Sequence, residues 1–257
     1  MQFQMWTPLH YAMMVFPFVL AGVLHYFVRN KPFNTKRNMG LALSVLMIII
    51  LIVRNAYIWI DKGALNPEVF PFQVCHFASF VFLLAVLSKD QLWGTMGWCL
   101  NFPAGLVSVV FADGLENYST LVHTQAIAYV LGHMLIVTTG LYLLTTGFIR
   151  ISWQSLKRMY FWAGAGYFLS VFVNNLFNNL FAHTGVDSNY FYSFKPEAGT
   201  PLEAMFDMGA SYTVAGITFN PVYLLLLAVV GTVVLGTMYG FFLVAKSGIQ
   251  RQKVGTA

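Results

Sequence analysis

Cys75 and His76 stand side by side in FPFQVCHFASFVF, residues 70–82, a stretch that is otherwise mostly apolar. A thiol becomes a nucleophile when a base or a positive charge helps it to ionise. His76 is adjacent, but consecutive side chains on a helix point about 100° apart, so it is poorly placed to take the Cys75 proton. His133 lies in another apolar segment and could approach the thiol directly. A cysteine–histidine pair of this kind suits acyl transfer, in which the thiolate attacks a lipid ester and an acceptor then takes the acyl group from the thioester.

Each of these residues also has a simpler interpretation. A free cysteine in a membrane helix usually behaves as a small hydrophobic residue, and this is our expectation for Cys99, the other cysteine of the chain. His76 at the start of a helix is also compatible with an interfacial position. Two cysteines do not make a disulfide framework and fit no zinc spacing, so we expect neither a metal nor a cofactor.

The composition predicts a membrane protein. Of the 257 residues, 58% are hydrophobic and only 9% are charged, whereas soluble domains carry about 25% charged residues. The net charge of +5 is informative loop by loop and does not indicate a nucleic-acid partner. The first apolar segment lacks a basic region and a small-residue cleavage site, so we expect no cleaved signal peptide.

Seven apolar segments are long enough to cross a hydrocarbon core of about 30 Å as helices, the third and fourth only just. They are residues 9–28, 39–60, 70–87, 92–111, 121–147, 159–182 and 219–245. We therefore predict an all-α fold, one integral membrane domain over residues 1–257, built as a bundle of about seven transmembrane helices.

The charges of the loops predict the orientation. The first loop, the fifth loop and the tail are basic: Arg29, Lys31, Lys36, Arg37, Arg150, Lys157, Arg158, Lys246, Arg251 and Lys253. The second, fourth and sixth loops carry the acidic residues Asp61, Glu68, Asp113, Glu116, Asp187, Glu197, Glu203 and Asp207, and the third loop, Lys89-Asp90, is neutral. The positive-inside rule then places the N-terminus outside and the C-terminus in the cytoplasm.

With this orientation, polar side chains of four helices gather beneath the outer surface. Cys75 lies about five residues, or roughly 8 Å, below the outer end of its segment, and His133 lies in the outer half of the fifth segment. Helical spacing groups the others in stripes: Gln125, Tyr129 and His133; Tyr167, Ser170, Asn174 and Asn178; Arg54, Tyr57 and Asp61. Arg54 or an asparagine amide could stabilise an oxyanion. The alternatives are that the asparagines join helices and that Arg54 reaches the outer headgroups.

Three stretches resemble a known family. They are residues 70–80 around Cys75-His76, the Leu131-Gly132-His133 patch, and Asn189-Tyr190 with Lys195-Pro196 in SNYFYSFKPEAGTPLEAM. They are similar to the YwaF-like family of bacterial integral membrane proteins, which is related to the animal transmembrane protein 164 acyltransferases. The similarity runs from the second span through the sixth loop. Bacterial members often have His-Leu-Cys at the first motif, whereas the order Gln73-Val74-Cys75-His76 is closer to the animal pattern.

The resemblance implies a seven-helix bundle with an acyltransferase site in the cell membrane, and the depth of the polar side chains independently predicts that this site lies toward the extracytoplasmic side. Cys75 corresponds to the family's proposed nucleophile and His133 to its partner histidine. Substrates would be a membrane phospholipid as acyl donor and a lipid or lipid-anchored acceptor. The residues we expect to bind substrate or support the site are Arg54, His76, Tyr129, Asn174, Asn178, Tyr190 and Lys195. Thr200 to Glu203 also reads as a capping box, which predicts a short surface helix over residues 201–208 that could act as a lid.

Two other classes of membrane protein remain open. A heptahelical ligand-binding protein would share the topology, although a retinal protein needs a lysine in mid-membrane and the last segment has none before Lys246. A small-solute transporter would show broken helices in related halves, and Asn101-Phe102-Pro103 is one such break without an obvious counterpart. Transport would survive Cys75→Ala, whereas acyl transfer would not.

Overall fold

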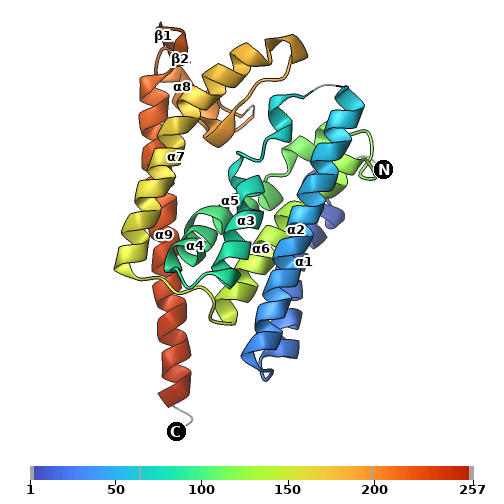
Figure 1. Cartoon of the computed structure of the whole chain (residues 1–257), viewed down its shortest axis with the longest axis vertical. Helices are drawn as coiled ribbons and strands as arrows, with labels where there is room; N and C mark the ends of the chain where they lie inside the picture. The colour runs from blue at the N-terminus through green and yellow to red at the C-terminus, as the bar shows by residue number, and fades with distance from the viewer. Residues whose placement is uncertain (1–2, 64, 198, 255–257) are drawn as a thin grey trace.

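The computed structural model describes residues 3–63, 65–197 and 199–254, with the side chains of Asp113, Asn117 and 247–254 outside that description. The chain is mostly helical (Figure 1). The long helices are α1 Pro8–Val28, α2 Phe33–Lys62, α3 Val74–Leu87, α6 Thr124–Thr145, α7 Trp153–Leu180 and α9 Pro221–Val254. The shorter elements are α4 Gln91–Met96, α5 Phe102–Val110, α8 Pro201–Asp207, the strands β1 Tyr212–Val214 and β2 Ile217–Phe219, and single turns at Pro67–Val69, Asp113–Asn117, Ala182–Thr184 and Tyr190–Tyr192.

The predicted all-α membrane architecture is supported by the length and apolar character of the helices. Among the described residues, five candidate spans meet both criteria: Pro8–Val28, Phe33–Lys62, Pro67–Leu87, Thr124–Thr145 and Pro221–Lys246. The predicted span 92–111 is a helix interrupted by a π segment, and 159–182 overlaps α7, which ends at Leu180 and carries buried asparagines. The count of seven spans and the orientation therefore stay predictions, and Arg251 and Lys253 lie outside the described side chains.

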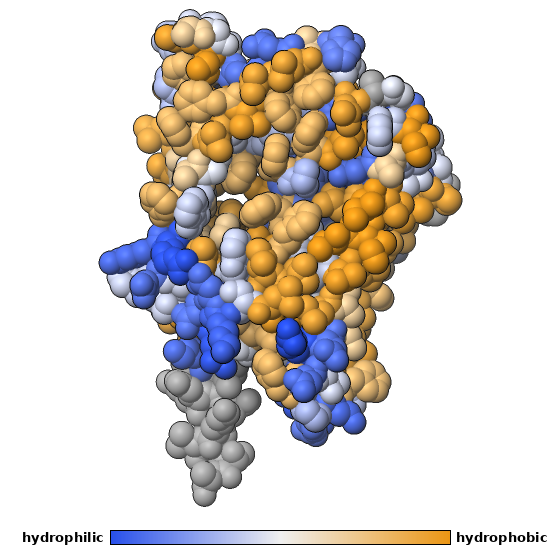
Figure 2. Space-filling view, viewed as in Figure 1, coloured by the Kyte–Doolittle hydropathy of each residue, from blue (hydrophilic) through white to orange (hydrophobic). Residues whose placement is uncertain are grey.

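Large apolar side chains cover the outside of the bundle. Phe16, Ile60, Phe161, Leu176 and Val244 are among those that are more than half exposed. On the face shown in Figure 2, apolar side chains cover most of the upper and middle parts, and hydrophilic patches lie at the lower ends of the helices. Apolar surface of this extent is stable when it faces lipid.

The third predicted helix begins later than expected. We predicted a span from residue 70, but α3 starts at Val74, so Cys75 is the second residue of its helix and not the sixth. The reason is Pro71, which keeps the preceding Phe70 out of the helical region; Phe70 has φ −79° and ψ 133°. The chain instead descends from the top of α2 as residues 65–73, here called the descending segment, before α3 begins (Figure 1).

Residues 91–110 form one rod with a π segment, Gly97–Asn101, between α4 and α5. Pro103 has no N–H to donate to the carbonyl four residues earlier, and an extra residue per turn accommodates that gap. The predicted break at Asn101-Phe102-Pro103 is thus a widened turn. The indole N–H of Trp98 in this segment donates to the Met238 carbonyl of α9 at 2.8 Å, which ties the rod to the last helix.

Glycines let the central helices approach closely. A Cβ at Gly105 of α5 would lie 2.5 Å from Ile136 of α6, and one at Gly140 of α6 would lie 2.8 Å from the Phe102 ring. Because neither contact leaves room for a methyl group, α5 and α6 can pack this tightly only with glycine at both positions. The resulting block of α2, α3, α5 and α6 holds the predicted catalytic residues.

The short helix that we predicted over residues 201–208 is present as α8. Thr200 is its N-cap and accepts from the Leu202 N–H at 3.3 Å, and Pro201 is the first helical residue. The Phe206 ring of α8 packs edge-on against Tyr223 of α9, with the ring centroids 5.2 Å apart. The helix therefore lies on the first turn of α9, and a role as lid stays a prediction.

Candidate active site

Side chains from other helices hold the descending segment in place. The donors are Tyr190 Oη to the Pro67 carbonyl (2.6 Å), Arg54 Nη1 to Glu68 (2.9 Å), Asn55 Nδ2 to Val69 (2.7 Å) and Asn101 Nδ2 to Val74 (2.8 Å). Non-helical backbone at membrane depth must find its hydrogen bonds within the protein. These donors therefore fix the point at which α3 begins, and with it the position of Cys75.

Two of those donors were predicted as site residues and two were missed. Arg54 and Tyr190 were expected near the site, whereas Asn55 and Asn101 were not singled out as donors. The descending segment itself could not be seen, because residues 70–87 form one apolar run in the sequence. The paired prolines, Pro67 and Pro71, were the available signal that this run does not start as a helix.

Cys75 lies at the N-terminus of α3, where backbone N–H groups lack partners within the helix. Gln73, the N-cap, does not cap them with its side chain, and the N–H groups of Cys75 and His76 point at the thiol instead. The positive charge of Arg54 also acts on the Cys75 sulfur. An apolar environment disfavours a thiolate, and these N–H groups and the guanidinium act against that effect but offset only part of it.

His133 is held in one tautomer. Its Nδ1 lies 2.8 Å from the carbonyl oxygen of Tyr129, one turn earlier on α6. A carbonyl can only accept, so Nδ1 carries the proton and donates, and Nε2 is left with its lone pair. The Tyr129 ring packs on the imidazole with centroids 4.2 Å apart, and its hydroxyl donates to the Ser108 carbonyl at 2.9 Å. The buried imidazole is thus oriented as a base.

The titratable groups of three helices share one electrostatic environment. Arg54 of α2 acts on Cys75, His76 and His133, and His133 also acts on His76. Helices α2, α3 and α6 pack against one another around them. Among the described residues, no hydrogen bond joins the thiol to either imidazole, and His76 Nδ1 is buried without a partner. Catalytic hydrogen bonds are often long in a resting site, so both histidines stay candidates for the base.

The asparagine stripe of α7 supports a loop. Asn174 donates to the Tyr190 carbonyl and to Ser193, and its Oδ1 accepts from Ser188 and from the Tyr190 N–H. Asn178 bonds both backbone groups of Ser188. The hydrogen-bonding capacity of the Asn174 amide is therefore filled, which favours the structural interpretation of this stripe over an oxyanion role.

The loop held by Asn174 reaches the descending segment. The Tyr190 ring packs edge-on against Phe72 and Phe177, with centroids 5.4 Å and 5.9 Å away, and burial raises the pKa of Tyr190 to about 12. Tyr190 therefore keeps its hydroxyl proton and its hydrogen bond to Pro67. Lys195 instead forms a surface ion pair with Asp187 at 2.6 Å, where both side chains are about half exposed.

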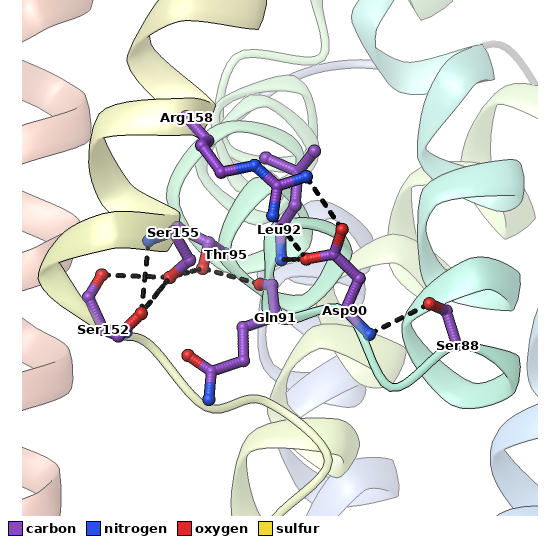
Figure 3. Close-up of polar contacts among 8 residues, drawn as sticks. All are labelled: Ser88, Asp90, Gln91, Leu92, Thr95, Ser152, Ser155 and Arg158. Atoms are coloured by element: carbon purple, nitrogen blue, oxygen red, sulfur yellow. Dashed lines mark hydrogen bonds and ion pairs between the residues drawn. The ribbon is translucent and has the colours of Figure 1, made fainter.

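An apolar cavity of about 620 Å³ lies on another side of α3, between α3, the α4–α5 rod and α7, and is called here the α7 cavity. Val74 and Phe77 of α3 line it, but Cys75 and His133 do not. At one end, Arg158 of α7 makes a two-fold ion pair with Asp90, the N-cap of α4, at 2.9 Å and 2.8 Å (Figure 3). The hydrogen bonds from Arg158 hold the pKa of Asp90 below its usual value.

Comparisons with known proteins give one match. The model of the TMEM164 family matches residues 5–239, which is nearly the whole chain. No curated protein and no solved structure matches.

Proposed function

Because the chain belongs to the TMEM164 family, we propose that it is a membrane acyltransferase that moves a fatty acyl chain from a phospholipid to a lipid or lipid-like acceptor. Cys75 is the nucleophile of this proposal and His133 the base. We further propose a seven-span topology with the N-terminus outside, which puts the site toward the extracytoplasmic side of the cell membrane. Neither a metal nor a cofactor takes part in the proposed steps.

The hydrogen bond from His133 to Tyr129 is the observation that carries the proposal. A general base needs a free lone pair and a fixed ring, and the bond at 2.8 Å supplies both at Nε2. The second requirement is a positive environment for the thiolate, and Arg54 and the N-terminal N–H groups of α3 contribute to it. A histidine with a purely structural role would also make the hydrogen bond to Tyr129. Such a role would not account for the positive groups around Cys75.

The proposed reaction has two halves. In the first, His133 Nε2 takes the proton of the Cys75 thiol, and the sulfur attacks the carbonyl carbon of the lipid ester. The bond between that carbon and the glycerol oxygen breaks, and the imidazolium returns the proton to the leaving oxygen. In the second, the acceptor hydroxyl gives its proton to Nε2 and attacks the thioester. The carbon–sulfur bond breaks, and the sulfur regains the proton from His133.

Arg54 is the candidate donor for the oxyanion of both halves. A guanidinium has five N–H donors, and Nη1 uses its hydrogen bonds on Asn55 and the Glu68 carbonyl. These bonds hold the charge in place, so it requires little reorganisation when the oxyanion forms. His76 is the alternative donor, since its buried Nδ1 has no partner among the residues that the structure describes.

Intact-protein mass spectrometry tests the covalent step. Purified protein incubated with phospholipid should gain the mass of one acyl chain, and hydroxylamine should remove it because it cleaves thioesters. Peptide mapping should place the adduct on Cys75. An adduct on Cys99, or acyl transfer that proceeds in Cys75→Ala, would refute the proposed nucleophile.

A small-solute transporter is the second candidate, and the π segment at Gly97–Asn101 is the observation in its favour, because such turns often occur at functional sites. The α7 cavity is lined mostly by apolar side chains, which suits a lipid chain better than a hydrated solute. Transport by reconstituted Cys75→Ala protein at the wild-type rate would favour the transporter.

A further inference from the structure

The α7 cavity has the size and form of a ligand site. Its volume of about 620 Å³ falls within the range of about 300–1,000 Å³ that is usual for small-molecule pockets. It extends along α7 from Arg158 to Val173, which is roughly 22 Å at the rise of an α-helix. Most of its lining is apolar, with Trp93, Trp162 and Leu169 as large members. A long apolar cavity of this kind fits an aliphatic chain.

One polar group in the wall has no partner. Asn101 is fully buried and lines the α7 cavity, and its Nδ2 donates to the Val74 carbonyl at 2.8 Å. That bond fixes the orientation of the amide, because a carbonyl can only accept. Oδ1 then has no donor within residues 3–63, 65–197 and 199–254. A buried acceptor without a donor is costly, so a ligand whose donor reached Oδ1 would relieve that cost.

An ion pair closes the opposite end of the cavity. The Asp90–Arg158 pair lines it there, and both side chains are partly exposed, at 36% and 45%. Figure 3 shows this pair beside the hydrogen-bonded group of Ser152, Ser155 and Thr95. A terminal methyl group gains nothing by displacing a two-fold ion pair, so the pair marks the limit of the apolar space.

We propose that the α7 cavity binds the aliphatic chain of one lipid, whose hydroxyl or amine donates a hydrogen bond to Asn101 Oδ1 while the chain runs toward Asp90 and Arg158. Val74 accepts from Asn101 and precedes Cys75, so the polar end of this lipid lies at the first turn of α3. The lipid nature of the ligand rests on the proposed function. Binding itself needs no turnover.

Photo-cross-linking with hexadecanol probes tests the site in the purified Cys75→Ala chain in phosphatidylcholine nanodiscs. A probe with its diazirine next to the hydroxyl should label peptides around Val74 and Leu100. A probe with its diazirine near the methyl end should label peptides around Trp93 and Trp162. A donor-free probe, hexadecyl methyl ether, should lose this order along the cavity because nothing fixes its polar end at Asn101.

Two glycines of α7 provide a matched pair of variants. Gly166 lines the cavity, and a Cβ there would meet Phe191 at 3.6 Å, an ordinary contact, so Gly166→Leu fills space without a backbone clash. Gly164 is exposed and a Cβ there meets nothing within 4 Å. Gly166→Leu should reduce labelling at least tenfold, and Gly164→Leu should leave it unchanged.

Three results would overturn the chain site: labelling spread evenly over the lipid-facing helices α1 and α9, labelling of Gly166→Leu equal to that of Gly164→Leu, or the same labelling order with the methyl ether. The proposed function fails separately, since acyl transfer that survives Cys75→Ala refutes the nucleophile without affecting cross-links in the cavity. Ordered, Gly166-dependent labelling supports the chain site in either case.

Discussion

The imidazole of His133 donates a hydrogen bond to the backbone carbonyl of Tyr129 at 2.8 Å, and the same tyrosine anchors α6 to α5 through its hydroxyl. Tyr129 thus orients the ring in two ways: its carbonyl sets the tautomer, and its side chain packs on the imidazole face. The consequence is a fixed Nε2 lone pair in a helix that packs directly against α3. The predictions for the catalytic residues start from this arrangement.

Cys75→Ala should reduce acyl transfer to background and abolish the hydroxylamine-sensitive adduct, because no other atom can form the thioester. Cys75→Ser should be nearly as inactive, since a hydroxyl ionises much less readily than a thiol. Cys99→Ala is the matched control: Cys99 is buried in the core among apolar side chains, so its loss should leave turnover intact. Activity is measured as transfer of a labelled acyl chain in proteoliposomes.

His133→Ala should lower the rate by about 10²–10⁴-fold, the usual contribution of a general base. Part of that loss should return as the pH approaches about 8.5, where a thiol ionises unaided. A pH–rate profile from pH 6 to 10 measures this. A His133→Ala profile with the wild-type shape would contradict the role of base.

His76→Ala separates the two histidines. A small effect assigns the proton transfer to His133, and a loss with the same alkaline recovery assigns it to His76. The structure favours the first outcome, because His76 Nδ1 has no partner that would fix its tautomer within the described residues, whereas His133 has one.

Tyr190→Phe should destabilise the descending segment. The variant removes only the hydroxyl that donates to the Pro67 carbonyl at 2.6 Å, and a lost hydrogen bond of this kind costs about 1 kcal/mol, more if the carbonyl stays buried and unpaired. Both Tm and acyl transfer should fall, because this segment positions Cys75. Tyr212→Phe, on the exposed strand β1, is the control. Equal behaviour of the two variants would show that the Pro67 bond does not position the site.

The membrane class and most helices were predictable because apolar length and composition determine them directly. Residues 9–28 and 39–60 fall inside α1 and α2, and the α8 helix followed from Thr200-Pro201. The descending segment was not predictable from hydropathy, since Phe70, Pro71 and Phe72 are apolar whether or not they are helical. It is revealed only by the side chains that donate hydrogen bonds to the backbone carbonyls of Pro67, Glu68 and Val69.

The residues of the candidate site could be proposed from the sequence, but their geometry could not be predicted. Cys75 and His133 could be chosen by residue type and resemblance, but the helical position of Cys75 depends on where α3 starts. Asn174 was predicted to lie among the polar side chains beneath the outer surface, and its partners are on a loop that follows it in sequence. Periodicity describes one helix at a time, so it gives the face of a side chain and not the partner across from it.

Cysteine scanning tests the orientation. Cysteines introduced at Lys36 and Arg150 should resist an impermeant maleimide in intact cells, and cysteines at Asp113 and Glu197 should react, in a Cys75→Ala, Cys99→Ala background. Lys36 and Arg150 belong to loops that the positive-inside rule assigns to the cytoplasm. Labelling at position 36 from outside would invert the topology and move the site to the inner leaflet.

Asp90→Asn should make the free energy of unfolding less dependent on pH in the acidic range. Hydrogen bonds from Arg158 lower the pKa of Asp90 in the folded state, so the pair stabilises the fold above the unfolded-state pKa of about 3.9, and this contribution is lost as the pH falls through the folded-state value. At pH 7 the variant should therefore have a slightly lower Tm than the wild type, and the difference should shrink between about pH 5 and pH 3. The difference at pH 7 should also shrink in 1 M NaCl, because both side chains are partly exposed.

Asp61→Asn, at the exposed end of α2, is the control and should follow the wild-type curve. A constant Tm difference from pH 7 to pH 3 would mean that the Asp90 carboxylate contributes through its N-cap geometry at Leu92, which asparagine preserves only in part, and not through the charge of Arg158.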